Sequence, residues 1–109
     1  MFLYNCILDM KQTEIVVRTD HPPTVELDSE AHAAYIRFSR NKVVKTHPIL
    51  IEGVIVTADM DKAGNVIGIE LIGVKEFGIR ELIAKAHVRG VSKRLQQQTR
   101  YVPAKLQTA

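Results

Sequence analysis

Up to residue 72, apolar and polar residues tend to alternate along the chain. In the run AAYIRF, residues 33–38, every second residue is apolar, while Tyr35 and Arg37 share the opposite side. The run NVIGIELI, residues 65–72, alternates in the same way and places Glu70 on its polar side. Because successive side chains of a strand point to opposite faces, this period of two predicts two half-buried β-strands.

Shorter runs of β-branched and aliphatic residues predict further strands. Residues that favour turns separate them, among them the DHPP cluster at residues 20–23. Pro48 marks a strand edge or a break, and Gly53 marks a bulge or bend. The additional strands are expected at residues 13–18, 24–27, 43–46 and 49–57.

The period of the pattern changes after Gly73. Apolar residues then recur at the spacing i, i+3, i+4 and i+7, which places them on one side of an α-helix. These residues are Ile79, Leu82, Ile83 and Ala86. We therefore expect an amphipathic helix around residues 75–89 that ends near Gly90.

Together these elements predict an α+β fold, in which a small antiparallel sheet of four or five short strands packs one C-terminal amphipathic helix on one face. Residues 24–90 would form this single domain. Residues 1–23 would be an N-terminal extension with a short strand, and residues 91–109 a basic tail that is flexible or bound to a partner. With 109 residues, 46% of them hydrophobic, the chain is long enough for one modest core.

The stretch DMDKAGNVIGIE, residues 59–70, is similar in composition to a calcium-binding loop. Such a loop needs acidic ligands at fixed spacing, a central glycine and a helix on each side. Ala63 replaces one acidic ligand, and both flanking sequences are strand patterns. We therefore interpret the stretch as a hairpin turn, in which Gly64 supplies the backbone conformation that a tight connection requires.

Three segments, VELDSEAHAAYIRFS, VVKT and GVIVTADMDKAGNVIGIELIG, resemble the small bacterial domain of unknown function family 2283 (DUF2283) over roughly residues 24–73. The G-I-E-L portion is the most specific part of the resemblance. The chain departs from the family pattern at His32, at Ala63 and at Thr57-Ala58. The resemblance implies a compact antiparallel sheet backed by a helix and transfers no biochemical activity. Some members resemble the antitoxin half of a two-protein module, which implies a protein partner.

No apolar run in the chain approaches the ~20 residues needed to span a bilayer. The apolar start MFLYNCIL has no basic residue before it and no small-residue cleavage site after it, so it does not fit a secretory signal. We therefore expect a cytoplasmic protein without membrane contact, for which Met10 offers an alternative start. Cys6 is the single cysteine, which rules out an intrachain disulfide and a cysteine-based metal cluster.

Charge is distributed unevenly along the chain. Residues 1–79 carry 8 Lys and Arg against 11 Asp and Glu, whereas residues 80–109 carry 7 against 1. This basic segment is a candidate surface for a nucleic-acid backbone, with an aromatic ring available for stacking. Its alternatives are a segment that orders on a protein partner and an ordinary solvated helix face with a tail. The candidate residues are Arg89, Lys93, Arg94, Arg100 and Tyr101.

The sequence contains no nucleophile elbow, no phosphate-cradling glycine loop and no zinc-binding histidine pair. We therefore expect no enzymatic activity and no cofactor. The four histidines lie on separate predicted elements. Asp59 and Asp61 are weak candidates for a metal site, which would need His32, Glu30 and Asp28 to converge on them.

The polar face of the predicted sheet is a candidate interface. Tyr35, Arg37 and Glu70 would share this face and contact another subunit or a partner. The plain alternative is a solvated face with a cross-strand Arg–Glu contact worth under about 1 kcal/mol. Gly68 would let a neighbouring backbone or aromatic ring approach closely. Exposed strand edges in so small a sheet favour a homodimer or an edge-to-edge complex.

From the sequence, we expect a non-enzymatic interaction module, such as a protein-binding regulator that resembles an antitoxin. The alternative is a nucleic-acid-binding accessory protein that uses the basic C-terminal segment. Binding to phosphates would weaken steeply as salt rises, whereas an interface with an apolar core would not.

Overall fold

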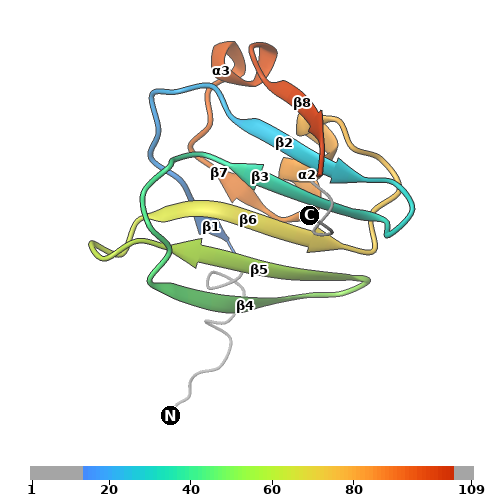
Figure 1. Ribbon diagram of the computed structural model, residues 1–109, viewed down its shortest axis with the longest axis horizontal. Coiled ribbons are helices and arrows are strands. Elements are labelled where there is room, and N and C mark those ends of the chain that lie inside the picture. Colours follow the sequence, from blue (N-terminus) through green and yellow to red (C-terminus); the bar gives the residue numbers. More distant parts are fainter. Residues whose placement is uncertain (1–13, 105–109) are drawn as a thin grey trace.

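The structure is a computed structural model that describes residues 14–104 (Figure 1). Its main element is a six-stranded β-sheet with the strand order β4-β5-β6-β3-β2-β8. The strands of this sheet are β2 (Thr24–Asp28), β3 (Ala33–Arg37), β4 (Lys45–Ile51), β5 (Val54–Met60), β6 (Val66–Ile72) and β8 (Arg100–Pro103). The remaining elements are β1 (Ile15–Val16), β7 (Val88–Arg89), α2 (Ile79–Lys85) and α3 (Lys93–Gln97). Cys6 and Met10 lie outside the described residues.

The α+β class is confirmed, but the prediction of four or five antiparallel strands with one helix is wrong. The neighbouring strands from β4 to β2 pair antiparallel, whereas β8 lies parallel to β2. The additional strand comes from the segment that we interpreted as a tail. Ser92 caps α3 by accepting a hydrogen bond of 3.2 Å from the backbone N–H of Leu95, and the chain then turns back along β2. The four residues of β8, which end in Pro103, are too few to show a recognisable alternation.

The helix after Gly73 is also shorter than the predicted span of residues 75–89. α2 ends at Lys85, and His87 adopts a left-handed backbone conformation with φ of 57°. A left-handed residue just past a helix commonly ends it, although glycine is the usual residue there. The chain continues as β7, which pairs in parallel with β1. No helix among residues 14–104 is long and apolar enough to cross a membrane.

The hydrophobic core lies between one face of the large sheet and a second layer, which contains the helices and the β1–β7 pair (Figure 1). Alternate strand residues fill it from the sheet, and apolar residues of the second layer meet them. The core side chains that are almost completely buried include Val17, Val25, Ile36, Val56, Ile69, Leu71 and Leu82. Among the described residues, no helix covers the opposite face of the sheet, which we call the outer face (Figure 1).

The β4–β5 hairpin divides its residues differently from the prediction. Pro48 lies within β4, and Gly53, with φ of 87°, lies in the turn, so of the two predicted alternatives it marks a bend and not a bulge. β4 is an edge strand with a neighbour on one side only. An edge strand tolerates proline because the missing N–H can lie on its open side.

The stretch 59–70 forms a hairpin, as predicted, between β5 and β6. The backbone N–H of Gly64 donates to the carbonyl of Asp61 over 3.0 Å, and Gly64 has φ of 88°. The Asp61 carboxylate accepts hydrogen bonds from the backbone N–H groups of Ala63 and Asn65. The Asn65 bond, with a further bond from the Asn41 side chain, lowers the pKa of Asp61. Because strands flank the turn and the Asp61 carboxylate serves it, the calcium-loop interpretation is excluded.

Candidate interaction surfaces on the sheet

Tyr35 lies at the centre of the outer face. Its side chain lies across Gly68 of β6, where an added Cβ atom would collide with the Tyr35 hydroxyl group. That hydroxyl donates a hydrogen bond of 2.7 Å to Oδ2 of Asp59 on β5. Partial burial and the bond to Asp59 raise the pKa of Tyr35, so the hydroxyl keeps its proton to a higher pH than an ordinary tyrosine does. The prediction that Gly68 admits an aromatic ring is therefore confirmed.

Further side chains extend this contact into a network across the sheet. Oδ1 of Asp59 accepts a hydrogen bond of 2.7 Å from the hydroxyl of Thr46 on β4. On the other side, Arg37 lies over the Tyr35 ring, with Cζ 5.0 Å from the ring centroid. Its Nε and Nη2 donate to Oε2 of Glu26 over 3.1 and 3.0 Å. Because the Arg37 and Glu26 side chains are 40% and 31% exposed, their ion pair contributes at most about 1 kcal/mol to stability.

Tyr35, Arg37 and Glu70 lie on the outer face together, as the alternation predicted. Tyr35 is directly opposite Glu70 in the β3–β6 register. Arg37, however, forms its ion pair with Glu26 of β2. Within residues 14–104, Glu70 forms no salt bridge. The sequence pattern thus gave the shared face but not the partner of Arg37, because the pattern contains no strand order.

The outer face is hollowed beside this network. The hollow has a volume of about 540 Å³ and is lined by four carboxylates and by the single guanidinium of Arg37. The four acidic residues are Glu26, Asp28, Asp59 and Glu70. We call this site the acidic hollow. Its excess of carboxylates favours contact with positively charged groups.

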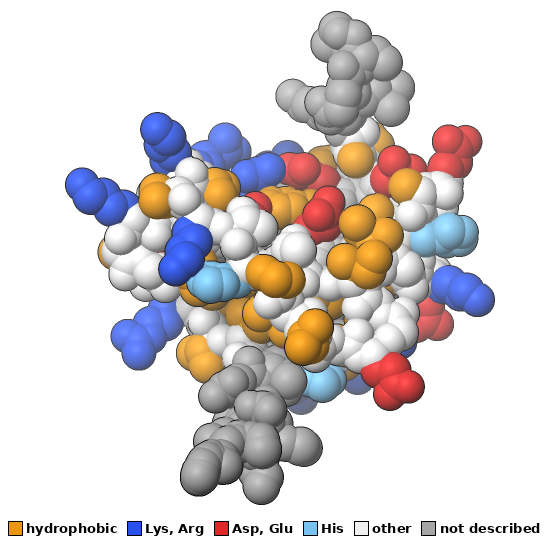
Figure 2. Space-filling view, turned by 90° about the horizontal axis from the view of Figure 1, so that it is seen from below, with side chains coloured by type: hydrophobic (Ala, Val, Ile, Leu, Met, Phe, Trp, Pro, Cys, Tyr) orange, Lys and Arg blue, Asp and Glu red, His pale blue; other side chains and the backbone are white. Residues whose placement is uncertain are grey.

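Three large hydrophobic side chains lie side by side on the same face. Leu50 of β4 is opposite Ile55 of β5, and Ile55 is opposite Ile72 of β6. Their exposed fractions are 87%, 62% and 38%. We call these three residues the apolar row, and Figure 2 shows hydrophobic side chains exposed on the side of the molecule where β4 lies. Our sequence reasoning missed the row, although the consecutive apolar residues in PILI and GVIV signal apolar side chains on both faces.

The candidate residues of the C-terminal segment lie on three different elements, β7, α3 and β8. Arg89 lies in β7 and donates a hydrogen bond of 3.2 Å to Glu14. Lys93 and Arg94 lie in α3, on a different element. Basic residues that are close in sequence thus belong to separate elements and not to one continuous helix face.

The last two candidates of that segment lie in β8. Arg100 is its first residue, and it is exposed. The Tyr101 hydroxyl accepts a hydrogen bond of 2.8 Å from the backbone N–H of Ile79, the first residue of α2. Tyr101 thus links β8 to α2 by a hydrogen bond. The hypothesis that its ring stacks on a nucleic-acid base did not include this structural role.

Asp59 and Asp61, the weak candidates for a metal site, do not converge with the other acidic residues and His32. Both oxygens of Asp59 accept hydrogen bonds, and the Asp61 carboxylate serves its turn. Asp59 is opposite Gly68, whereas the His32 carbonyl accepts a hydrogen bond from Gly73, five residues further along. That spacing corresponds to roughly 16 Å along a strand. In the part of the chain from 14 to 104, no three His, Cys, Asp or Glu residues converge as metal ligands.

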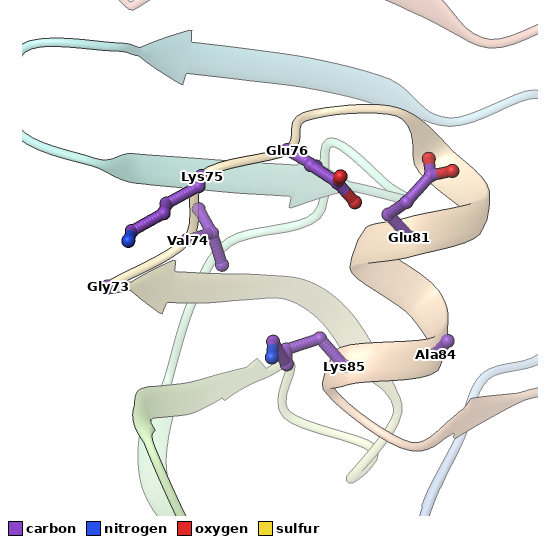
Figure 3. A pocket seen from close by; sticks show the side chains of 7 residues that line it. All are labelled: Gly73, Val74, Lys75, Glu76, Glu81, Ala84 and Lys85. Atoms are coloured by element: carbon purple, nitrogen blue, oxygen red, sulfur yellow. The ribbon is translucent and has the colours of Figure 1, made fainter.

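Another hollow, of about 700 Å³, lies between the β6–α2 connection and α2 (Figure 3). Lys75 and Lys85 line it together with Glu76 and Glu81, and all four are exposed. Positive and negative side chains are thus equal in number around it. Its charges therefore favour neither an anion nor a cation.

A comparison with protein families bears on the sheet. Residues 24–75 match the family described as "Protein of unknown function (DUF2283)". This span runs from β2 through β6, so it includes all antiparallel pairs of the large sheet, the acidic residues of the hollow and the apolar row. No curated protein and no solved structure matches the chain. The resemblance found in the sequence is confirmed, and residues 24–75 are a DUF2283-like domain.

Proposed function

We propose that this protein is a non-catalytic interaction module that binds a protein partner on the outer face of its sheet. The observation that carries the proposal is the apolar row, in which Leu50 is 87% exposed. Burying one such aliphatic side chain completely contributes about 1.5–3 kcal/mol. Contact with the row would therefore supply buried apolar area for the core of an interface.

The faces of the sheet are better suited to this contact than its edges. Ile51 and Val54 form the pair that closes the β4–β5 hairpin. Along β4, residues whose backbone groups bond β5 alternate with residues whose backbone groups point to the open side. Counting from Ile51, Pro48 is one of the residues that point to the open side. Pro48 lacks the N–H that an added strand would need there. β8, the other edge strand, ends in Pro103. These prolines argue against the edge-to-edge complex that we expected from the sequence.

Charge indicates what kind of partner fits. The acidic hollow adjoins the same face and carries four carboxylates against one guanidinium. A partner with apolar side chains and a basic rim would therefore meet both features, and opposite charges would speed its encounter. A regulator that covers a basic protein surface, as an antitoxin does, has this chemistry.

The polar groups of the outer face support a role without catalysis. Both oxygens of Asp59 are occupied by hydroxyl donors. Tyr35, whose pKa is raised, holds its proton more tightly than an ordinary tyrosine and is therefore a weaker acid. General acid–base catalysis needs a titratable group near neutral pH that can reach a substrate. The network is suited to fixing the shape of the face.

A homodimer, which we expected from the sequence, is a second arrangement of the same surface. Two copies related by a twofold axis would bury one apolar row against the other. The same arrangement would bring two acidic hollows towards each other, at a cost from like charges. We therefore favour a basic partner. The nucleic-acid alternative has weaker support, because its basic residues lie on three separate elements.

A matched pair of variants tests the proposal. Ile55 of the apolar row is 62% exposed, and Val16, on β1, is 59% exposed. The tagged full-length chain, Ile55→Asp and Val16→Asp would each be captured gently from the native cells and measured by native mass spectrometry. Circular dichroism would confirm that both variants keep the fold.

We expect the wild type and Val16→Asp to carry the same second protein in stoichiometric amount. Ile55→Asp should weaken that complex by about tenfold or more, because a charge would be buried against apolar atoms. A complex of unchanged affinity in Ile55→Asp would refute the proposed surface. If the wild type and Val16→Asp form a symmetric oligomer that Ile55→Asp does not form, the occupant of the apolar row is a second copy of this chain and not a basic partner.

A further inference from the structure

A hollow lined by basic residues, in contrast to the acidic hollow, lies at the end of the sheet where β2 and β8 begin and β3 ends. Its volume is about 520 Å³. The chain segments around it are the connection before β2, the connection after β3 and the start of β8. Its polar lining includes His21, Arg37, Ser39, Arg40, Asn41 and Arg100. We call this site the basic pocket.

Three arginines and no carboxylate line the basic pocket. Arg40 and Arg100 are exposed, and neither forms a salt bridge within residues 14–104. Arg40 and Arg100 therefore share the hollow without a counter-charge of their own among the described residues, which raises its potential and attracts anions. Figure 2 shows the same asymmetry at larger scale, with Lys and Arg gathered on one side of the molecule and most Asp and Glu on the other.

Glu26 fixes the orientation of the third arginine. Nε and Nη2 of Arg37 donate to Glu26, while Nη1 has no acceptor among the described residues. Because the guanidinium is a rigid planar fork, fixing one edge sets the direction of the other. Arg37 therefore offers donors that are held in place before an anion arrives.

Hydrogen bonds within the β3–β4 connection shape the opposite wall. The Ser39 hydroxyl oxygen accepts a bond of 3.1 Å from the backbone N–H of Asn41, which leaves the hydroxyl proton free to be donated. The Asn41 side chain donates to Asp61 over 3.0 Å, which ties the connection to the β5–β6 turn. The connection thus keeps its form without a ligand.

We propose that the basic pocket binds the phosphate group of a small phosphate ester of nucleotide size. A phosphate has several oxygens and a double negative charge, and arginine forks match its geometry with paired hydrogen bonds. A volume of about 520 Å³ is in the range of sites for small molecules. The site lies at the opposite end of the strands from the apolar row, so variants of Arg40 and Arg100 test it without changing that row.

The test uses the full chain and three probes: adenosine 5′-monophosphate, inorganic phosphate and a short thymidine oligonucleotide. Binding would be followed by calorimetry and by amide NMR shifts. The variants are Arg40→Ser and Arg100→Ser, with Arg40→Lys retaining the charge. Lys75→Ser is the control, because it removes one positive charge from the hollow beside α2.

We expect saturable binding of the monophosphate, with shifts at Arg40, Asn41 and Arg100. Arg40→Ser and Arg100→Ser should each weaken it by about tenfold or more, since each removes a charge-assisted hydrogen bond. Arg40→Lys should recover part of the loss, and Lys75→Ser should bind as the wild type does.

Absence of monophosphate binding at millimolar concentration would overturn the proposal. So would binding that both arginine variants retain. Binding of the oligonucleotide without the monophosphate would overturn it as well, because the site would then follow a polymer backbone rather than hold a small ester.

Discussion

The acidic hollow and the basic pocket lie close together on one sheet, and the Arg37 side chain lines both. Four carboxylates surround it on one side, and two further arginines on the other. The acidic residues all fall within the matched span 24–75, whereas Arg100 and His21 of the basic pocket do not. One arginine, fixed by Glu26, thus lies between two surfaces that favour partners of opposite charge.

The outer-face network should break most severely at Gly68. In Gly68→Val, the new side chain would collide with the Tyr35 ring and displace its hydroxyl from Asp59. We expect a loss of about 1–3 kcal/mol in the free energy of unfolding, measured with urea.

The control is the same substitution in a Tyr35→Ala background. There the collision is absent, and valine suits a strand better than glycine. Gly68→Val should therefore cost nothing in that background. An equal cost in both backgrounds would show that the close approach of Tyr35 is not the reason for glycine.

Removing the Tyr35 hydroxyl should have a smaller effect. Tyr35→Phe leaves Oδ2 of Asp59 without its donor, so we expect a loss of about 1 kcal/mol near neutral pH. The folded protein holds the Tyr35 proton above the ordinary pKa of 10.0, whereas the unfolded chain releases it there. The stability contributed by the hydroxyl is thus complete below pH 10 and declines as the pH rises further.

Urea unfolding of both proteins at several pH values checks this sign. The difference in the free energy of unfolding between wild type and Tyr35→Phe should shrink above pH 10. A difference that grows with pH would contradict the assignment of the raised pKa to Tyr35.

Arg37→Met should change stability least and binding most broadly. The ion pair with Glu26 is partly exposed, so its loss should cost under about 1 kcal/mol. The variant makes the acidic hollow more acidic and removes one donor from the basic pocket. We expect calorimetry to show weaker monophosphate binding and mass spectrometry to show an unchanged or tighter basic partner. Equal weakening of both ligands would show that the two surfaces are not separate.

Much of the sheet could be predicted from the sequence. The alternation in residues 33–38 and 65–72 placed Tyr35, Arg37 and Glu70 on one face, because period two is set locally by the strand backbone. Asp61 and Gly64 identified the hairpin because their effect on the turn is also local: the Asp61 carboxylate bonds a nearby backbone N–H, and Gly64 has a positive φ.

The elements that sequence reasoning missed depend on contacts between distant residues. β8 is a strand because it pairs with β2, more than seventy positions earlier in the chain. The apolar row exists because Leu50, Ile55 and Ile72 are aligned by register across three strands. No local pattern contains such alignments, so strand order has to come from the structure.

Side-chain footprinting of the captured complex tests the proposed function most directly. Hydroxyl radicals would label the free full chain and the chain bound to its partner, and mass spectrometry would compare the labelled residues. We predict protection of Leu50, Ile55 and Ile72, with unchanged labelling of Val16, which is 59% exposed on β1. Protection at Val16 with an apolar row that stays labelled would contradict the account.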